Sequence, residues 1–504
     1  MSKKTPKYKA KTIDTSGYNN ELTAAQNALT AIGNFNYNDA AGYKERSENA
    51  FNDWNDLYSG QGKANFDASQ QKLQTTVDDL FDQIMNYGDF SYDQEKDQLF
   101  QIYKQQYLSA GAGAMKNQLA AASANTGGYN NSYAQQSAQQ AYNNTMSGLS
   151  DKAIELRANA LTTWQNEYNQ IQDRYNLVNN QKAAEESMVL LKNEAEILPL
   201  TAGTRVAVIG DFAFEPRYQG VGSSSVNAIC VENAAEKIFD TDLMVVGMER
   251  GYRRDGKADY NLEAQALELA SKAEVILYFL GLGETEESEG LDRKNFEIPQ
   301  NQISLLQKLT KKNPAIVAVL STGSVVDIGW KIDCRAVLHT GLSGEAGAGA
   351  VLNVLTGKVN PGGKLTESWI CHYDDTPSAF VYPAKERTLP YGEGIYVGYR
   401  YFEKEQIPVS FPFGFGLSYT TFTYSGLEVE ENGIRLRIKN VGEIAGSEIV
   451  QMYVALPDRK IERPEKELKG FAKVYLEAGE EKEVCILFDD KTFRVFDEEA
   501  GKRG

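Results

Sequence analysis

Hydrophobic residues in the N-terminal third of the chain are spaced for helices. Apolar positions recur at helical intervals within residues 66–87 and 93–122, and we expect a third helix from about 133 to 176. A break rich in glycine and asparagine at 124–131 separates the last two. Because each apolar stripe is narrow, these helices are expected to pack against partners. Residues 1–182 are thus predicted to be a mainly α module, rich in Asn, Gln, Ala and Tyr.

The pattern changes after residue 182. Short β-branched runs alternate with helical patterns, with strands expected at 206–210, 275–280, 315–320 and 336–338, and helices at 261–272, 299–311 and 344–356. This alternation predicts an α/β sandwich with a mostly parallel sheet over residues 183–371. Glycine-rich loops follow several strands, at 220–225, 321–324 and 341–345. We expect them to line one edge of the sheet.

The remaining chain predicts a connector and then an all-β domain. Residues 372–421 are irregular and contain several prolines. Residues 422–504 alternate apolar and polar positions in period two, with turn signals between the runs, which predicts an antiparallel β-sandwich. We expect this sandwich to be incomplete, because few residues follow its last strand-like run.

Composition narrows the classes of partner and cofactor. A net charge of −17 argues against nucleic acid and against an anionic membrane surface. Four scattered cysteines without a C-x-x-C pair are interpreted as buried free thiols, and two histidines are too few for a histidine-rich metal site. We therefore expect no cofactor and no metal. No run reaches the roughly 18 apolar residues of a membrane span, and no apolar segment follows the basic start. A cytoplasmic location is expected.

An acidic loop at residues 281–293 is the most informative stretch, with the sequence G-L-G-E-T-E-E-S-E-G-L-D-R. It follows a strand-like run and precedes a helix with proline in its first turn. Its carboxylates therefore gather at a strand end, the edge where open α/β sheets bind ligands. For an isolated acidic run, a solvated loop is the usual explanation.

The pattern E-x-E-G-x-D-R in this loop resembles the segment that carries the general acid/base of family 3 glycoside hydrolases. Six further motifs resemble that family in its own order: A-A-E-E-S-M-V-L-L-K-N from 183, R-Y-Q-G-V-G-S-S from 217, V-N-P-G-G-K-L from 359, Y-G-E-G-I-Y-V-G-Y-R-Y from 391, F-G-F-G-L-S-Y-T-T-F from 413 and E-R-P-E-K-E-L-K-G-F from 462. The resemblance covers about residues 183–498. It implies the family's second α/β domain followed by a truncated fibronectin-III-like domain.

The resemblance also implies a β-glucosidase-like hydrolase that acts on a β-linked oligosaccharide or glycoside. It places the general acid/base at Glu289, with Glu287 as the fallback. We expect neighbouring carboxylates to raise the pKa of Glu289, as a proton donor requires.

Five further residues are assigned to the same site by their motifs. The first three, which are candidates for the wall of the sugar cleft, are Arg217, Gln219 and Ser223. A purely structural loop around neighbouring glycines is the alternative for them. The other two, Asp292 and Arg293, are expected to orient the acidic loop as a charge-assisted pair.

The family's mechanism needs a second carboxylate, an aspartate nucleophile carried by a (β/α)8 barrel. Residues 1–182 show no strand-like runs, so we expect no barrel there. The segment most similar to the nucleophile motif is N-D-W, which contains Asp53, and no strand-like run precedes it. The chain is thus expected to be inactive alone, and a barrel-bearing protein in trans is a second expected partner.

The stretch from about 90 to 175 resembles a segment that recurs in virion-associated proteins of phages of gut bacteria. The residues T-G-G-Y-N-N-S-Y-A-Q-Q from 126 carry this resemblance, and a generic helical spacer is the alternative. A second hypothesis is therefore a carbohydrate-binding or structural fusion protein with a phage-like helical module. A non-functional remnant is the third. The sequence leaves open a natural fusion, a decayed gene and an assembly error.

Overall fold

The computed structural model of this chain describes residues 68–88, 90–125, 132–228, 230–382, 387–455, 462–494, 496–497 and 502–503. Contacts along the chain divide it into two units, Met1–Ala64 and Asn65–Gly504. The first unit lies outside the described residues, as do Asp53 and most of the glycine- and asparagine-rich break. The elements below belong to the second unit.

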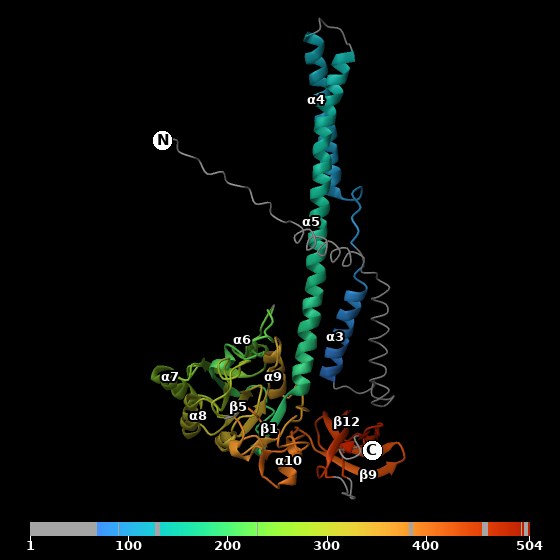
Figure 1. The fold of residues 1–504 in the computed structure, drawn as a ribbon. Coiled ribbons are helices and arrows are strands. Elements are labelled where there is room, and N and C mark those ends of the chain that lie inside the picture. Colours follow the sequence, from blue (N-terminus) through green and yellow to red (C-terminus); the bar gives the residue numbers. More distant parts are fainter. Residues whose placement is uncertain are drawn as a thin grey trace, which may run out of the picture. The chain divides into compact units, whose positions relative to one another are not determined.

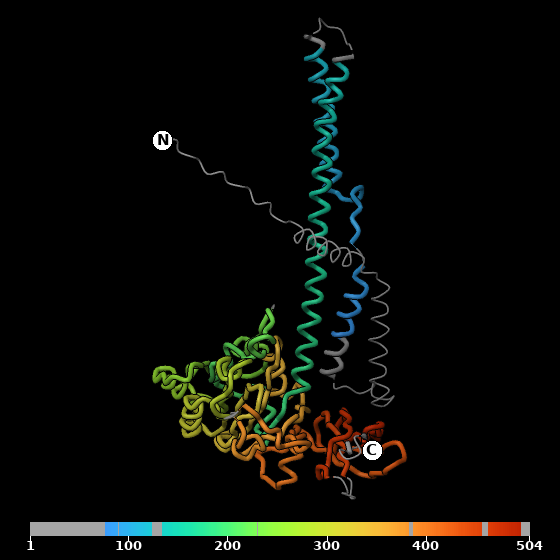
Figure 2. Tube along the Cα trace, in the orientation of Figure 1, coloured from blue at the N-terminus to red at the C-terminus, as the bar shows by residue number. Residues whose placement is uncertain are grey.

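Within the described residues, three helices precede the sheet domain, as the apolar spacing predicts. They are α3 (Ala68–Met85), α4 (Gln98–Asn125) and α5 (Ser132–Ser187). The helices α4 and α5 run side by side as a hairpin (Figures 1 and 2). Beyond the end of α3, the ring of Tyr87 packs on Trp164 of α5, and its hydroxyl donates to Glu167 at 2.9 Å. Aromatic packing thus supplements the narrow apolar stripes of these helices.

The helix α5 is longer than its apolar spacing predicts, because it continues past 176 to Ser187 and crosses residue 182 without a break. Its last turns bind the sheet domain directly. The Asn180 side chain accepts a hydrogen bond from the Ala346 backbone N–H at 2.8 Å, and Asn353 donates to the Glu185 carboxylate at 2.7 Å. These contacts extend the helix beyond what its own sequence specifies. The domain boundary at 182 stays a sequence-based prediction.

A six-stranded sheet forms the next domain, in the order β1-β6-β5-β4-β2-β3. Its strands are β1 (Val189–Asn193), β2 (Arg205–Ile209), β3 (Met244–Glu249), β4 (Val275–Gly281), β5 (Ile316–Ser321) and β6 (Ala336–His339). All neighbours pair in parallel except β1 and β6. The predicted mostly parallel sheet is confirmed. The strands β1 and β3 at the two edges were not predicted, and β3 is only half-buried, which weakens its apolar signal.

The core of this domain is centred on β4, whose seven residues are all buried. The helices are α6 (Ala234–Lys237), α7 (Tyr260–Ala270), α8 (Gln300–Lys312) and α9 (Gly347–Leu355). In α8 the buried positions follow helical spacing, because Gln302, Leu305 and Leu309 share one face. Burying a leucine side chain contributes about 1.5–3 kcal/mol, so these stripes fix α8 on the sheet.

The connector and the last domain follow. The connector contains β7 (Trp369–Ile370), α10 (Tyr399–Lys404) and β8 (Val409–Phe411). Two antiparallel sheets then form, one of β9 (Phe422–Glu430), β10 (Gly433–Asn440) and β13 (Glu481–Leu487), the other of β11 (Gly446–Val454) and β12 (Glu467–Leu476). A short pair, β14 (Phe496–Asp497) and β15 (Lys502–Arg503), lies near the end. Buried residues alternate along β10 and β13, which confirms the period-two prediction.

All four cysteines are free thiols, as predicted, but their predicted burial holds only in part. Cys334 is buried, whereas Cys230 and Cys485 are exposed. Across the described ranges, His, Cys, Asp and Glu side chains do not gather into a group suited to a metal ion. Among the helices of the same ranges, none has the length and apolar character to cross a membrane.

A buried glutamine supports the end of β4. The Gln302 side-chain amide donates to the Gly281 carbonyl and accepts from the Gly281 N–H, both at 3.0 Å. We predict that Gln302→Leu lowers the free energy of unfolding by about 1–3 kcal/mol, because it leaves two buried backbone groups unpaired. Urea unfolding measures the change. The exposed neighbour Gln300 is the control, and Gln300→Leu should change stability by less than about 0.5 kcal/mol. Equal effects of the two substitutions would contradict the prediction.

Candidate active site

The acidic loop stands at the point where the sheet reverses its winding. In the sheet order, β4 lies between β5 and β2. The chain leaves β2 toward β3 on one side and leaves β4 toward β5 on the other. A topological switch point therefore lies between β2 and β4, and open α/β sheets bind ligands in the crevice at such points. The loop that follows β4 borders this crevice.

A buried arginine from the loop after β2 shapes the acidic loop. The Arg217 guanidinium is 3% exposed and donates to the carbonyls of Leu282 at 3.1 Å, Gly283 at 2.8 Å and Glu287 at 3.0 Å. It also donates to the Gln219 carbonyl at 3.0 Å. These bonds supply side-chain donors to the backbone carbonyls of a tight loop. The hydrogen-bonding capacity of Arg217 is thus directed mainly at the loop backbone, and its sugar contact stays a prediction.

Glu287 fastens the acidic loop to the loop after β5. Its carboxylate accepts hydrogen bonds from the Gly323 N–H at 2.9 Å and from the Ser324 hydroxyl at 2.5 Å. Its side chain is 11% exposed, and one oxygen lies 3.8 Å from the Arg217 guanidinium. A carboxylate that is mostly shielded from solvent and bonded in this way is well suited to hold the loop. The glycine-rich loop at 321–324 does line the sheet edge, as expected.

Glu289 fastens the same loop on the opposite side, to the loop after β2. One carboxylate oxygen accepts from the Ser223 N–H at 2.6 Å and from the Ser223 hydroxyl at 2.5 Å. The backbone at Gly222 has φ +98°, and a Cβ there would lie 2.6 Å from the Glu289 side chain. Gly290 has φ +78° and turns the chain immediately after the glutamate. Unlike Glu287, Glu289 is exposed.

The pKa of the Glu289 carboxyl is lowered, whereas the sequence led us to expect a raised pKa. The hydroxyl of Ser223, and then its backbone N–H, lower the pKa of the Glu289 carboxyl, because both hydrogen bonds favour the charged form. The expected rise in this pKa is therefore wrong for this structure. The physical reason is geometric, since the Glu287 carboxylate is turned to Gly323 and Ser324 on the other side of the loop.

The expected pairing of Asp292 with Arg293 does not form. Arg293 instead donates to the Ser324 hydroxyl and to the Val325 carbonyl, both at 2.9 Å, and burial lowers its pKa. Asp292 lies beside the Tyr382 hydroxyl, and the hydrogen bond between them, followed by burial and by the Asp292 charge, raises the pKa of that tyrosine. Arg293 still orients the acidic loop, but through the loop after β5 rather than through its neighbour.

Gln219 holds the loop after β2 in shape. Its amide accepts from the Val226 N–H at 2.9 Å and donates to the Val226 carbonyl at 3.2 Å and to the Tyr218 hydroxyl at 2.7 Å. The same loop carries Ser223. All seven predicted site residues therefore lie in or beside one set of three loops. Ser324, which binds both Glu287 and Arg293, was not predicted as a site residue, although its loop is glycine-rich.

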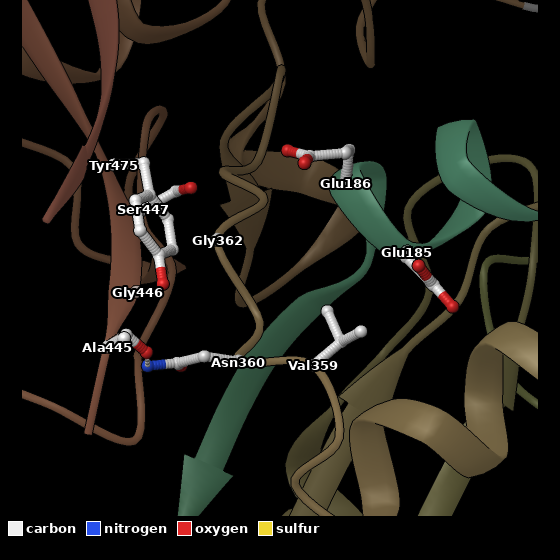
Figure 3. Close-up of a pocket in the computed structure, with 9 residues that line it drawn as sticks. All are labelled: Glu185, Glu186, Val359, Asn360, Gly362, Ala445, Gly446, Ser447 and Tyr475. Carbon is white, nitrogen blue, oxygen red and sulfur yellow. Dashed lines mark hydrogen bonds between the residues drawn. The ribbon is translucent and has the colours of Figure 1, made fainter. Parts of the chain in front are cut away.

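A hollow at the domain junction is too small for a sugar. Figure 3 shows its lining, which comes from the end of α5, the turn near Asn360 and the sandwich strands. Its volume is about 20 Å³, roughly the space of one water molecule. The Asn360 amide crosses it and donates to the Ala445 carbonyl at 3.0 Å. The junction thus serves packing, and the switch-point loops remain the candidate site.

Comparison with known proteins defines the class. Residues 188–419 match the glycosyl hydrolase family 3 C-terminal domain, and residues 448–503 match the fibronectin type III-like domain. The C-terminal part of this chain therefore matches the C-terminal domains of glycoside hydrolase family 3, as its motifs indicated. The comparisons leave the likeness of the N-terminal helices to phage proteins as a prediction.

Several relatives show how far the likeness extends. The thermostable beta-glucosidase B of Acetivibrio thermocellus is 41% identical over 326 residues, which are 62% of this chain and 43% of that protein. An exo-alpha-(1->6)-L-arabinopyranosidase of Bifidobacterium breve is 39% identical over 63% of this chain and 44% of its own length. The GH3 beta-glucosidase structure from Bifidobacterium adolescentis gives a TM-score of 0.62 at 36% identity, over 74% of this chain and 57% of that one. The chain thus spans less than half the length of the first two of these relatives.

The hydrogen bonds from Ser223 generate a prediction about the Glu289 pKa. In Ser223→Ala the carboxyl loses its hydroxyl donor, so its pKa should rise toward the ordinary value of 4.5. Because the folded pKa is lowered, the stabilisation is present above the ordinary pKa and is lost as pH falls through the lowered one. An NMR titration of labelled glutamate carboxyls measures the Glu289 pKa in the wild type and in Ser223→Ala. Ser224→Ala is the control, and an unchanged Glu289 pKa in Ser223→Ala would contradict the assignment.

Proposed function

We propose that this chain carries the acid/base part of a β-glucosidase-like hydrolase that acts on β-linked oligosaccharides or glycosides. One observation carries the proposal. Glu289 is an exposed carboxylate at the switch point of the sheet, within a match of 326 residues that is 41% identical to a β-glucosidase. The fallback, Glu287, is only partly exposed and is bonded to the loop after β5, so it is less available to a substrate.

The proposed chemistry uses two carboxylates about 5–5.5 Å apart. A nucleophilic carboxylate attacks the anomeric carbon while Glu289 gives its proton to the leaving glycosidic oxygen. Glu289, now ionised, then takes a proton from water, and the hydroxide attacks the glycosyl intermediate, which frees the sugar and restores the nucleophile. By the family resemblance, the nucleophile is an aspartate on a (β/α)8 barrel. We assign that role to a barrel-bearing partner, so that the chain alone is inactive.

The lowered pKa of Glu289 sets a condition on this mechanism. A proton donor near neutral pH needs a raised pKa, which burial and a second carboxylate produce. A barrel that covers the acidic loop would exclude water from Glu289 and place its own aspartate nearby. Both effects oppose the hydrogen bonds from Ser223. We infer that Ser223 releases Glu289, or turns to the substrate, when the site is assembled.

The remaining site residues divide by exposure into two proposed roles. Ser223 and Asp292 are exposed and Gln219 is half-buried, so we assign them to contact with the sugar or its leaving group. Arg217 and Arg293 are directed at backbone carbonyls and at Ser324, so they position the loop. The sequence instead assigned Arg217, Gln219 and Ser223 to the wall of the sugar cleft, and Asp292 and Arg293 to the orientation of the loop.

The alternative is a carbohydrate-binding or structural fusion protein. The continuity of α5 supports it, because one helix passes from the hairpin with α4 into the sheet domain. Such a protein would retain glycans without turning them over. Its binding would not depend on a nucleophile from another protein.

The full chain alone is predicted not to hydrolyse p-nitrophenyl β-glucoside above the buffer rate. Without a nucleophile, the reaction loses the covalent intermediate that divides it into two easier steps. The assay uses protein from a host that lacks glucosidases, with an intact family 3 β-glucosidase as the positive control. Turnover comparable with that control would overturn the requirement for a partner.

When a family 3 barrel restores activity, Glu289→Ala is predicted to lower kcat/KM by roughly 10²–10⁴-fold for a substrate with a poor leaving group. The loss should shrink for 2,4-dinitrophenyl β-glucoside, whose leaving group needs no proton. Glu284, whose exposed side chain pairs with Arg254, supplies the matched control in the same loop. Glu284→Gln should keep most of the activity. A larger loss for Glu287→Gln with retained folding would move the assignment to the fallback.

A further inference from the structure

The last turns of α5 reach a glycine-rich loop of the sheet domain. Figure 1 shows that α5 runs from its hairpin with α4 to the side of α9, and the two helices are in contact there. The match to the family 3 C-terminal domain begins at residue 188, so Asn180 of α5 precedes the matched region. The contacts of Asn180 therefore join the helical part of the chain to the domain that carries the candidate site.

Asn180 holds the loop after β6, residues 341–346. Its side-chain oxygen accepts a hydrogen bond from the Ala346 backbone N–H at 2.8 Å, and Ala346 is buried. The backbone at Gly344 has φ +71°, and a Cβ there would lie 2.7 Å from the same oxygen. The loop thus passes against the Asn180 amide at a distance that only glycine allows.

The loop after β6 in turn holds the loop after β2. The Gly344 N–H donates to the Tyr218 carbonyl at 2.9 Å. In the sheet, β5 and β4 lie between β6 and β2. This hydrogen bond therefore joins two loops across the carboxyl ends of the strands that separate them. Asn180 thereby supports, through Gly344, the segment that begins at Arg217.

That segment, residues 217–224, binds Glu289 directly. The Val221 carbonyl accepts from the Glu289 N–H at 3.3 Å, and the Ser223 N–H donates to the Glu289 carboxylate at 2.6 Å. The segment is thus tied to the acidic loop at one place and to the loop after β6 at Tyr218. A shift of the loop after β6 is expected to move Ser223 relative to Glu289.

We propose that Asn180 is a positioning residue of the candidate site, which acts on Glu289 through the loop after β6 and the segment 217–224. The path consists of three hydrogen bonds, from Ala346 to Asn180, from Gly344 to Tyr218 and from Ser223 to Glu289. The inference rests on the proposed function for the role of Glu289. It adds that a helix outside the matched family domain sets the geometry of that carboxylate.

The test uses the full chain and two readouts that need no turnover. Asn180→Ala keeps α5, because alanine is the best helix former, but it removes the acceptor of the Ala346 N–H. The segment 217–224 should then loosen, so that the Ser223 N–H exchanges with solvent about tenfold faster, as measured by NMR. The pKa of Glu289 should rise toward its ordinary value, because Ser223 is placed less well to donate to the carboxylate.

Three further variants test the same contact. Asn179→Ala changes a neighbour of the same type that is exposed, and it should leave both readouts at their wild-type values. Asn180→Asp keeps a side-chain oxygen as the acceptor and should preserve them as well. Gly344→Ala places a Cβ against the Asn180 amide and should produce the same two changes as Asn180→Ala. Unchanged readouts in both Asn180→Ala and Gly344→Ala, or equal changes in Asn179→Ala, overturn the proposal.

The outcomes also separate positioning from general stability and from catalysis. An equal acceleration of exchange at the buried amides of β4 would mean that Asn180→Ala weakens the whole domain, and it would overturn the positioning role. Turnover that survives Glu289→Ala in an enzyme reconstituted with a barrel would overturn the proposed function. The effect of Asn180→Ala on the Glu289 pKa would stand in that case, because it is measured without a substrate.

Discussion

The acidic loop keeps its shape because two of its carboxylates bind donors on opposite sides. Glu287 accepts from Gly323 and Ser324 after β5, and Glu289 accepts from Ser223 after β2. Several glutamates in so short a loop repel one another, and hydrogen bonds to charged acceptors, worth about 1.5–3 kcal/mol each, offset that repulsion. The loop is thereby stretched across the mouth of the crevice between β2 and β4. The geometry of the candidate site depends on these hydrogen bonds on the two sides of the loop.

The two glutamates, Glu287 and Glu289, differ in their surroundings and in their proposed roles. Glu287 contacts groups that are shielded from solvent. It lies beside the buried Arg217 guanidinium, and it shares the Ser324 hydroxyl with Arg293. Glu289 is exposed at the surface, where a partner or a substrate can displace its hydrogen bonds from Ser223. An ionised Glu289 keeps the isolated loop ordered, but a protonated Glu289 is required for acid catalysis. Under the proposed function, Glu289 must therefore gain a proton before it can act as the acid.

Support for the loop extends into the core and across the domain junctions. Gln302 holds the end of β4 from α8, so the loop begins from a fixed point. The helix α5 binds the domain through Asn180, and the connector binds the sandwich through Tyr396 and Glu462. These attachments leave Glu289 exposed at the edge of the sheet.

The sequence by itself determined the fold class, the parallel sheet and the family, because β-branched runs, helical spacing and ordered motifs are local signals. It also identified the acidic loop and its seven candidate residues. The tertiary structure decided how those residues work, since the partners of each side chain come from loops distant in sequence. Only the strand order β5-β4-β2 brings Ser324 and Ser223 to opposite sides of one loop. That order turned the expected pKa rise of Glu289 into a fall, and no local pattern encodes it.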